Sequence, residues 1–308
     1  MRKPNTIAAV QNTHYLKSGV KIPADATIET VMTEAKLNWN VDLGPISAAG
    51  KNVDGYFAVL RSDTRDALGV VQGRYKPIQN QKVFEFAEAI KSNPNAQASY
   101  DVAGALFGGR KVFATLSLPK ADFLGDEYQP YLFVYNSHDG SASFKAGITN
   151  VRIICTNRIT AMVNKARRVW NIRHTGNAQS RIKEAATSLM LASSYQEAFE
   201  KWAEEMATMK VKAPNVIKLV FPYPPVTTAR SIESVEKVRA EVLRIAEKKD
   251  DLQNFRNTGY GVYQAIADWN SHREPRRKTD TFAERHDKDF FVGDSLLEKT
   301  QKVLEKMA

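Results

Sequence analysis

The stretch PYLFVYNSHDGSASFKAGITNVRIICT, Pro130–Thr156, decides the fold class of this chain of 308 residues. Its first part, PYLFVYNSH, is rich in aromatic and β-branched residues, which favour strands. The following SHDGSAS has the composition of a tight turn. FKAGITNVRIICT then resumes the strand pattern. The stretch therefore predicts two strands joined by a short turn, as in an antiparallel sheet.

Further strands are predicted upstream of this stretch. They are indicated for LNWNVDL, YFAVLRSD, ALGVVQGRYKPI, ASYDVAGALF and RKVFATLSL, at residues 37–43, 56–63, 67–78, 98–107 and 110–118. SDTRD and FGGR between them are turn and hairpin signals. NQKVFEFAEAIKS, residues 80–92, has apolar residues at helical spacing, with Asn80 as the N-cap. Residues 37–175 are thus expected to form an α+β core, an antiparallel sheet with helices on one face.

The flanking regions have other patterns. Residues 1–36 are polar and predict a loosely attached N-terminal arm with a short helix near residues 26–35. NRITAMVNKA, residues 157–166, predicts a short helix at the end of the core. Residues 176–308 predict a mainly helical C-terminal region, in which a segment with four prolines, residues 213–226, interrupts the helices. Predicted helices there lie at residues 178–210, after Ser231, and at 259–272 and 293–306.

Composition favours a polyanionic partner. The chain has 44 Lys or Arg against 34 Asp or Glu, a net charge of +10, and nucleic acid suits this balance better than a membrane surface does. A basic surface without a binding role stays open. No window approaches the roughly 18 apolar residues of a membrane span, and the start has no signal peptide. Its single cysteine, Cys155, excludes an intramolecular disulfide and suits a reducing compartment.

A long basic segment is the strongest functional signal. Nine Lys or Arg residues and no carboxylate lie between Lys145 and Lys183. Such residues neutralise phosphates, and a carboxylate nearby would cancel the gain. Aromatic residues that could stack on unpaired bases accompany them, which favours single strands and little sequence specificity. The predicted nucleic-acid-binding residues are Arg74, Tyr75, Lys76, Lys145, Arg152, Arg158, Lys165, Arg167, Arg168, Arg173, Arg181 and Lys183. The alternative is that half of these cations face solvent without a binding role, and that Phe144 and Trp170 are core residues.

Signals for catalysis are weak. The sequence has no H-E-x-x-H zinc motif, no G-x-S-x-G elbow and no phosphate-binding glycine loop. We therefore expect no catalytic residues, no metal and no cofactor, and a protein that is not an enzyme. A metal-dependent nuclease built on His138, Asp139 and His174 stays a minor alternative. His138 is expected to be a turn residue that bonds locally with Asp139 and Ser141.

Four ordered blocks carry a family resemblance. They are the L-G-V-x-x-x-x-Y-x-P-x-Q-N block, the G-G-R hairpin, the N-S-H-D-G-S turn and the R-x-x-C-x-N block, at Leu68–Asn80, Gly108–Arg110, Asn136–Ser141 and Arg152–Asn157. With them the chain resembles the phage/plasmid-like family of unknown function, whose members occur in phages, prophages and conjugative plasmids. By analogy it is also similar, more distantly, to phage single-strand annealing proteins of the RecT, Redβ and Erf kind.

The resemblance implies a function and a setting. It implies a single-stranded-DNA-binding protein that anneals strands in recombination without ATP, as a homo-oligomeric ring or filament in the cytoplasm of a bacterial host cell. The alternative is an interaction protein of a mobile element that inhibits a host nuclease or another defence system.

Overall fold

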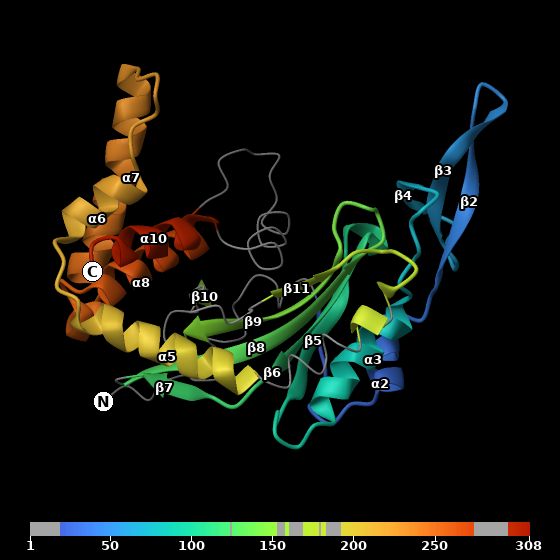
Figure 1. Cartoon of the computed structure of the whole chain (residues 1–308), viewed down its shortest axis with the longest axis horizontal. Helices are drawn as coiled ribbons and strands as arrows, with labels where there is room; N and C mark the ends of the chain where they lie inside the picture. Colours follow the sequence, from blue (N-terminus) through green and yellow to red (C-terminus); the bar gives the residue numbers. More distant parts are fainter. Residues whose placement is uncertain are drawn as a thin grey trace.

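The computed structural model has a long central sheet, a group of helices beyond one end of it and a smaller projecting sheet beyond the other (Figure 1). It describes residues 19–123, 125–152, 158–159, 169–178, 180–182, 192–273 and 295–308. The combination of antiparallel sheets with helices, most of them in the C-terminal half, confirms the predicted α+β class.

The central sheet is antiparallel throughout. Among the described residues its strands are β1 (Val20–Lys21), β5 (Ser99–Leu106), β6 (Lys111–Ser117), β7 (Ala121–Phe123), β8 (Asp126–Ser137), β9 (Phe144–Arg152), β10 (Arg158–Ile159) and β11 (Val169–Ile172). Their order is β1-β5-β6-β8-β9-β10, while β7 also pairs with β8 and β11 with β9. Strands close in sequence thus lie side by side, joined by the predicted turns.

The β8–β9 hairpin forms the middle of this sheet and confirms the prediction from residues 130–156 up to Arg152. Its register pairs Leu132 with Ile148 and Tyr135 with Lys145. Successive residues of a strand point to opposite faces, and here Leu132 and Val134 join the main core while Phe133 and Tyr135 join a second cluster. Both faces of β8 are therefore buried, which explains its nearly continuous run of apolar residues.

One helix prediction near the end of the core is wrong in its described part. Arg158 and Ile159 form strand β10, which pairs with β9 at Val151 and Asn150. The other residues of NRITAMVNKA lie outside the described residues.

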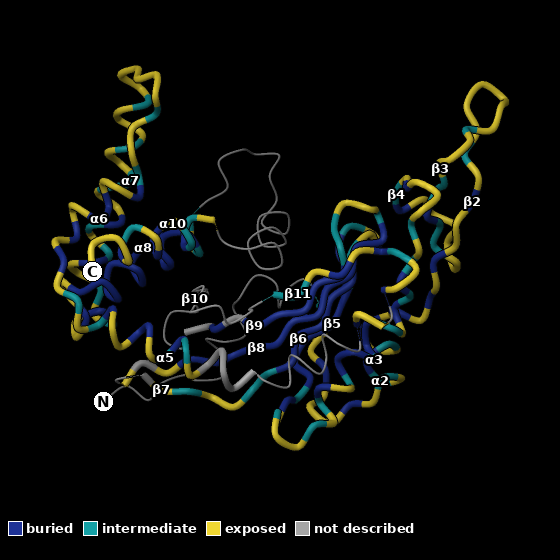
Figure 2. Tube along the Cα trace, viewed as in Figure 1, coloured by how far each residue is buried: buried dark blue, intermediate teal, exposed yellow. Residues whose placement is uncertain are grey.

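A second, smaller sheet projects from the core. Its strands are β2 (Val41–Ala48), β3 (Lys51–Arg61) and β4 (Ala67–Gln72), in the order β2-β3-β4. The tip of the β2–β3 hairpin is exposed (Figure 2). The first of these strands begins at Val41, four residues later than LNWNVDL predicted, and Leu37 and Trp39 are instead core residues.

Two helices, α2 (Ile28–Glu34) and α3 (Asn80–Lys91), pack against each other, and α3 packs against β6 and β8. Phe86 of α3 meets Phe144 of β9 edge to face, with 5.3 Å between ring centroids. The described part of the N-terminal arm is not loosely attached, contrary to the prediction: β1 pairs with β5, and Ile22 and Val31 are buried in the main core.

The C-terminal region is helical, as predicted. Its described elements are α5 (Ala192–Thr208), α6 (Ala213–Val220), α7 (Ala229–Lys248), the 3-10 helix η3 (Asp250–Phe255), α8 (Gly259–His272) and α10 (Ser295–Glu305). Buried residues follow one another from Gly259 to Asn270, so α8 is the central helix, and α5, α6, α7 and α10 pack around it. Within the described ranges, no helix combines the length and the apolar character that crossing a membrane requires.

Two details of this region differ from the prediction. The proline-containing segment does not only interrupt the helices, because it contains α6, whose Pro214 lies in the first turn where its missing N–H is tolerated. Helix α7 begins at Ala229, two residues before Ser231: Thr228 is its N-cap, and Thr228 and Ser231 form a reciprocal capping box.

Candidate nucleic-acid interface

A pocket of about 680 Å³ lies where three segments that are distant in the sequence meet. The loop between β4 and α3 provides Tyr75, the β8–β9 turn provides Gly140–Ser143, and the end of β11 with the segment after it provides Asn171 and Arg173–Thr175. Arg181 completes the lining. No Asp or Glu is among these lining residues.

Direct contacts join the loop before α3 to the segment after β11. The backbone N–H of Lys76 donates to the carbonyl oxygen of His174 at 3.0 Å. The rings of Tyr75 and His174 stack, with 4.7 Å between their centroids and 9° between their planes. The Tyr75 hydroxyl donates to the Ser137 carbonyl at 3.1 Å, which links both segments to the end of β8. Tyr75 is therefore a half-buried residue whose ring already has one stacking partner.

The β8–β9 turn is held by its own side chains. The Ser137 hydroxyl and the Ser141 backbone N–H both donate to the Asp139 carboxylate, the latter at 2.9 Å. Desolvation alone would raise the pKa of Asp139, but these hydrogen bonds and the charge of Lys111 hold it below its ordinary value. The carboxylate therefore stays ionised, and both of these hydrogen bonds end on its Oδ1 oxygen within the turn.

His138 is buried beneath the turn and is not the locally bonded turn residue that we predicted. Its Nε2 lies 2.8 Å from Asn80 Oδ1, while Asn80 Nδ2 donates to the carbonyls of Leu37 and Trp39. Since the amide nitrogen of Asn80 donates, its oxygen accepts, and His138 is neutral with its proton on Nε2. Asn80 is therefore a buried connector rather than the predicted N-cap of α3, a position that Gln79 occupies.

Burial determines the charge of both histidines near the pocket. It disfavours the cationic form of His138, and together with the charge of His174 it lowers the pKa of His138 to about 3. Burial likewise lowers the pKa of His174 to about 4. Both rings are neutral at pH 7. The positive charge around this pocket therefore comes from arginine and lysine.

The backbone of β4 approaches the turn closely at a glycine. A Cβ added to Gly69 would lie 2.6 Å from both the Cα and the carbonyl oxygen of Asp139, which are backbone atoms. We expect Gly69→Ala to lower the free energy of unfolding by about 1–3 kcal/mol, because the turn must shift to make room. Urea denaturation measures this. Gly176→Ala, where the added Cβ meets nothing within 4 Å, is the control, and an equal loss there would contradict the steric explanation.

The predicted binding residues fall into four groups. Arg173 and Arg181 are exposed and line the pocket, and Arg74 and Lys76 are exposed on either side of Tyr75. Lys145 is 8% exposed within β9 and has interactions there, so it is not the surface cation that we predicted. Arg152 and Arg158 lie in β9 and β10, where only the backbone is described. The rest lie outside the described residues: Lys165, Arg167, Arg168 and Lys183.

Phe144 and Trp170, the two aromatic residues that accompany the basic segment, pack in the core, as the alternative without a binding role predicts. Phe144 is fully buried, and Trp170 packs against the main core. The aromatic pair at the pocket is Tyr75 and His174 instead. Sequence reasoning missed the pocket role of His174 and of Gly140–Ser143, although Gly140 and Ser141 belong to the N-S-H-D-G-S turn of the family resemblance.

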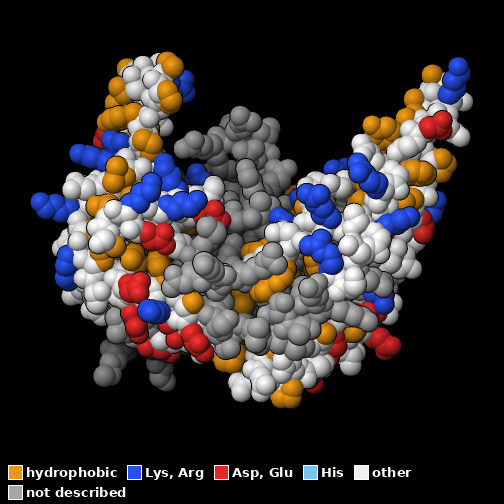
Figure 3. Space-filling model, in the orientation of Figure 1, with side chains coloured by type: hydrophobic (Ala, Val, Ile, Leu, Met, Phe, Trp, Pro, Cys, Tyr) orange, Lys and Arg blue, Asp and Glu red, His pale blue; other side chains and the backbone are white. Residues whose placement is uncertain are grey.

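Charges are segregated on the face of the molecule shown in Figure 3. Lys and Arg side chains gather in its upper part, over the helical group and over the end of the central sheet that lies beside the projecting sheet. Most Asp and Glu side chains lie lower. Within the described part of the chain, no group of three His, Cys, Asp or Glu residues is placed to hold a metal ion. His138, with its Nε2 bonded to Asn80, does not form a ligand set there with Asp139 and His174.

The fold and the pocket define a class of protein: an antiparallel α+β core, followed by a helical region, with a basic pocket at one end of its sheet that has no carboxylate among its described lining residues. The chain belongs to the family described as a domain of unknown function, DUF932, which matches residues 67–289. The match begins with β4 and includes every residue that lines the pocket. No curated protein and no solved structure matches the chain.

Proposed function

We propose that this protein binds single-stranded DNA at the Tyr75–Arg173–Arg181 pocket and anneals complementary strands without ATP, as a recombination protein of a phage or plasmid. The observation that carries the proposal is the convergence of Arg173 and Arg181 on a pocket whose described lining residues include no carboxylate. Guanidinium groups hold phosphates through paired hydrogen bonds, and binding releases the counterions of the strand.

The surroundings of the pocket support a strand rather than an isolated phosphate. Arg74 and Lys76 are exposed beside Tyr75 and extend the row of cations beyond the pocket. Beside them lies the half-buried ring of Tyr75, stacked on the buried and neutral His174. Contacts of this kind are made to the backbone and to base faces, so they are independent of sequence.

Annealing follows from this mode of binding. Cations that hold phosphates leave the base edges free to find a complement. One pocket holds only a few nucleotides, and we therefore propose that several protomers in a ring or filament hold an extended strand. The analogy with annealing proteins of the RecT, Redβ and Erf kind, drawn from the sequence, motivates this part of the proposal.

The proposal is tested with the purified protein and a labelled single-stranded oligonucleotide. With Arg74, Lys76, Arg173 and Arg181 on phosphates, affinity should fall about 50-fold between about 50 and 200 mM salt, since each contact contributes about 0.7 to the logarithmic slope. The protein should also accelerate annealing of complementary strands in the absence of ATP.

Two results would contradict the proposal. The first is an affinity that is absent or independent of salt. The second is purification with one stoichiometric host protein and no affinity for nucleic acid, which would favour inhibition of a host nuclease or defence system.

A further inference from the structure

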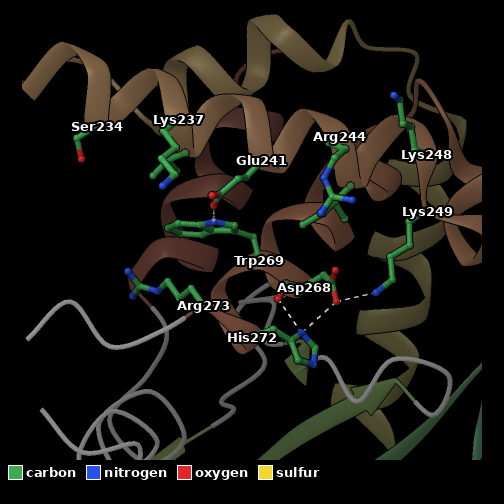
Figure 4. A pocket seen from close by; sticks show the side chains of 12 residues that line it. Ser234, Lys237, Glu241, Arg244, Lys248, Lys249, Asp268, Trp269, His272 and Arg273 are labelled. Atoms are coloured by element: carbon green, nitrogen blue, oxygen red, sulfur yellow. Dashed lines mark hydrogen bonds and ion pairs between the residues drawn. The ribbon is translucent and has the colours of Figure 1, made fainter. Parts of the chain in front are cut away.

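A second pocket, of about 780 Å³, lies between α7 and α8 in the helical region, and its lining is strongly basic. Seen from close by, side chains of α7 lie above Trp269 of α8, while His272 and Arg273 lie below it (Figure 4). Its charged lining residues are Lys237, Glu241, Arg244, Lys248, Lys249, Asp268, His272 and Arg273. Five Lys or Arg against two carboxylates make a formal charge of +3 with His272 neutral.

Both carboxylates of this pocket are already engaged. Glu241 accepts a hydrogen bond from the indole N–H of Trp269 at 2.9 Å. Asp268 accepts from Lys249 at 2.7 Å and lies 3.1 Å from His272 Nδ1. Desolvation would raise the pKa of Asp268, but its bonds with His272 and Lys249 hold it below its ordinary value. These two carboxylates are therefore fixed by other groups.

Three cations of α7 remain without a counter-charge. Lys237, Arg244 and Lys248 are exposed, and within the described residues none of them forms an ion pair or a side-chain hydrogen bond. Their spacing of seven and four residues places them on one face of the helix. Glu241 stands four residues from Lys237 and three from Arg244, yet it bonds to Trp269 instead. The pocket thus keeps a concentrated positive charge that the protein itself does not neutralise.

We propose that the α7–α8 pocket binds a ligand with several phosphate groups, held by Lys237, Arg244 and Lys248. Its volume suits a small-molecule ligand, and a chain of phosphates supplies the three or four negative charges that the lining lacks. Trp269 is only 9% exposed, and the guanidinium carbon of Arg273 lies 5.0 Å from the centre of its ring, so the site recognises charge rather than a base. The same chemistry is offered by a free nucleoside triphosphate and by the backbone of a DNA strand.

The test is titration calorimetry of the full chain with inorganic tripolyphosphate. The wild type should bind one tripolyphosphate per chain, and Arg244→Gln with Lys248→Gln should weaken binding at least tenfold. The control is Arg230→Gln with Lys302→Gln, which removes the same charges from exposed positions outside the pocket. The control should bind like the wild type, and all variants should keep the same thermal midpoint because every changed residue is exposed.

Further arms identify the source of the phosphates. If ATP binds as tightly as tripolyphosphate while the pocket variant keeps full affinity for an oligonucleotide, the ligand is a free nucleotide. If the oligonucleotide displaces tripolyphosphate and the pocket variant loses both, the strand backbone occupies the site. No binding by the wild type, or an equal loss in the control variant, would overturn the proposal. The interface at Arg173 and Arg181 is a separate site, and its failure would leave this result unchanged.

Discussion

Replacing Arg173 and Arg181 by Glu should reduce the affinity for single-stranded DNA about 100-fold or more at about 100 mM salt. Each guanidinium that holds a phosphate contributes about 1.5–3 kcal/mol, and each Glu adds repulsion. The logarithmic salt slope should fall by about 1.4, since two contacts are lost at about 0.7 each. Fluorescence anisotropy of a labelled oligonucleotide at several salt concentrations measures both quantities.

The matched control for this experiment is Lys51→Glu with Lys120→Glu. Both lysines are exposed, one at the tip of the β2–β3 hairpin and the other next to β7, and the pair makes the same change in net charge. We expect less than a threefold loss of affinity in the control. Because Arg173 and Arg181 are exposed, the free energy of unfolding of the double variant should differ from that of the wild type by no more than about 0.5 kcal/mol. Equal weakening in both variants would mean that net charge, and not the pocket, binds the strand.

The protein should lose several kcal/mol of stability between pH 6.5 and pH 5. His138 and His174 have folded pKa values of about 3 and about 4, whereas an unfolded histidine titrates near 6.5. Below pH 6.5 the unfolded chain binds protons that the folded chain does not, so stability is full above that pH and falls as the pH falls toward the folded values. Each histidine lowers the free energy of unfolding by about 1.4 kcal/mol per pH unit below 6.5, which amounts to about 2 kcal/mol at pH 5.

A histidine variant tests the origin of this acid sensitivity. His138→Gln retains an amide that can donate to Asn80 but cannot titrate, so its stability at pH 7 should fall while its loss between pH 6.5 and pH 5 should be about 2 kcal/mol smaller. Urea denaturation at each pH measures the difference. An unchanged pH dependence in this variant would show that His138 is not the buried neutral group inferred from its bond with Asn80.

His272 supplies a control of opposite sign. Its hydrogen bond with Asp268 raises its pKa above the ordinary value, against the effect of burial. The stability that it contributes is therefore present below the unfolded pKa and is lost as the pH rises through the folded one. His272→Gln should make the acid loss steeper, whereas His138→Gln makes it shallower.

Local patterns predicted the secondary structure well where neighbours in sequence decide it. The β8–β9 and β5–β6 hairpins and helices α8 and α10 formed as predicted, because turn composition and apolar periodicity act over a few residues. They failed at Arg158–Ile159, where pairing with β9 imposes a strand on a pattern that resembles a helix. Pairing is a tertiary contact, and it overrides local preference.

The candidate interface was predicted in part. The sequence indicated Tyr75, Arg173 and Arg181, and the structure brings all three to one pocket. It also indicated Lys145, which is buried in β9, opposite Tyr135 of β8 and Asn171 of β11 in the sheet register. Whether a cation in a strand faces solvent depends on what covers that strand, and the strand itself does not encode this.

The sequence by itself determined the α+β class, the positions of the turns and an excess of positive charge with no carboxylate between Lys145 and Lys183. Tertiary structure alone decided that Tyr75 stacks on His174 and that Asn80 bonds His138, which bring together residues 99 and 58 positions apart. Periodicity and turn chemistry are local and can be read along the chain. Which side chains are buried, and which distant residues meet at one site, depends on partners that only folding brings into contact.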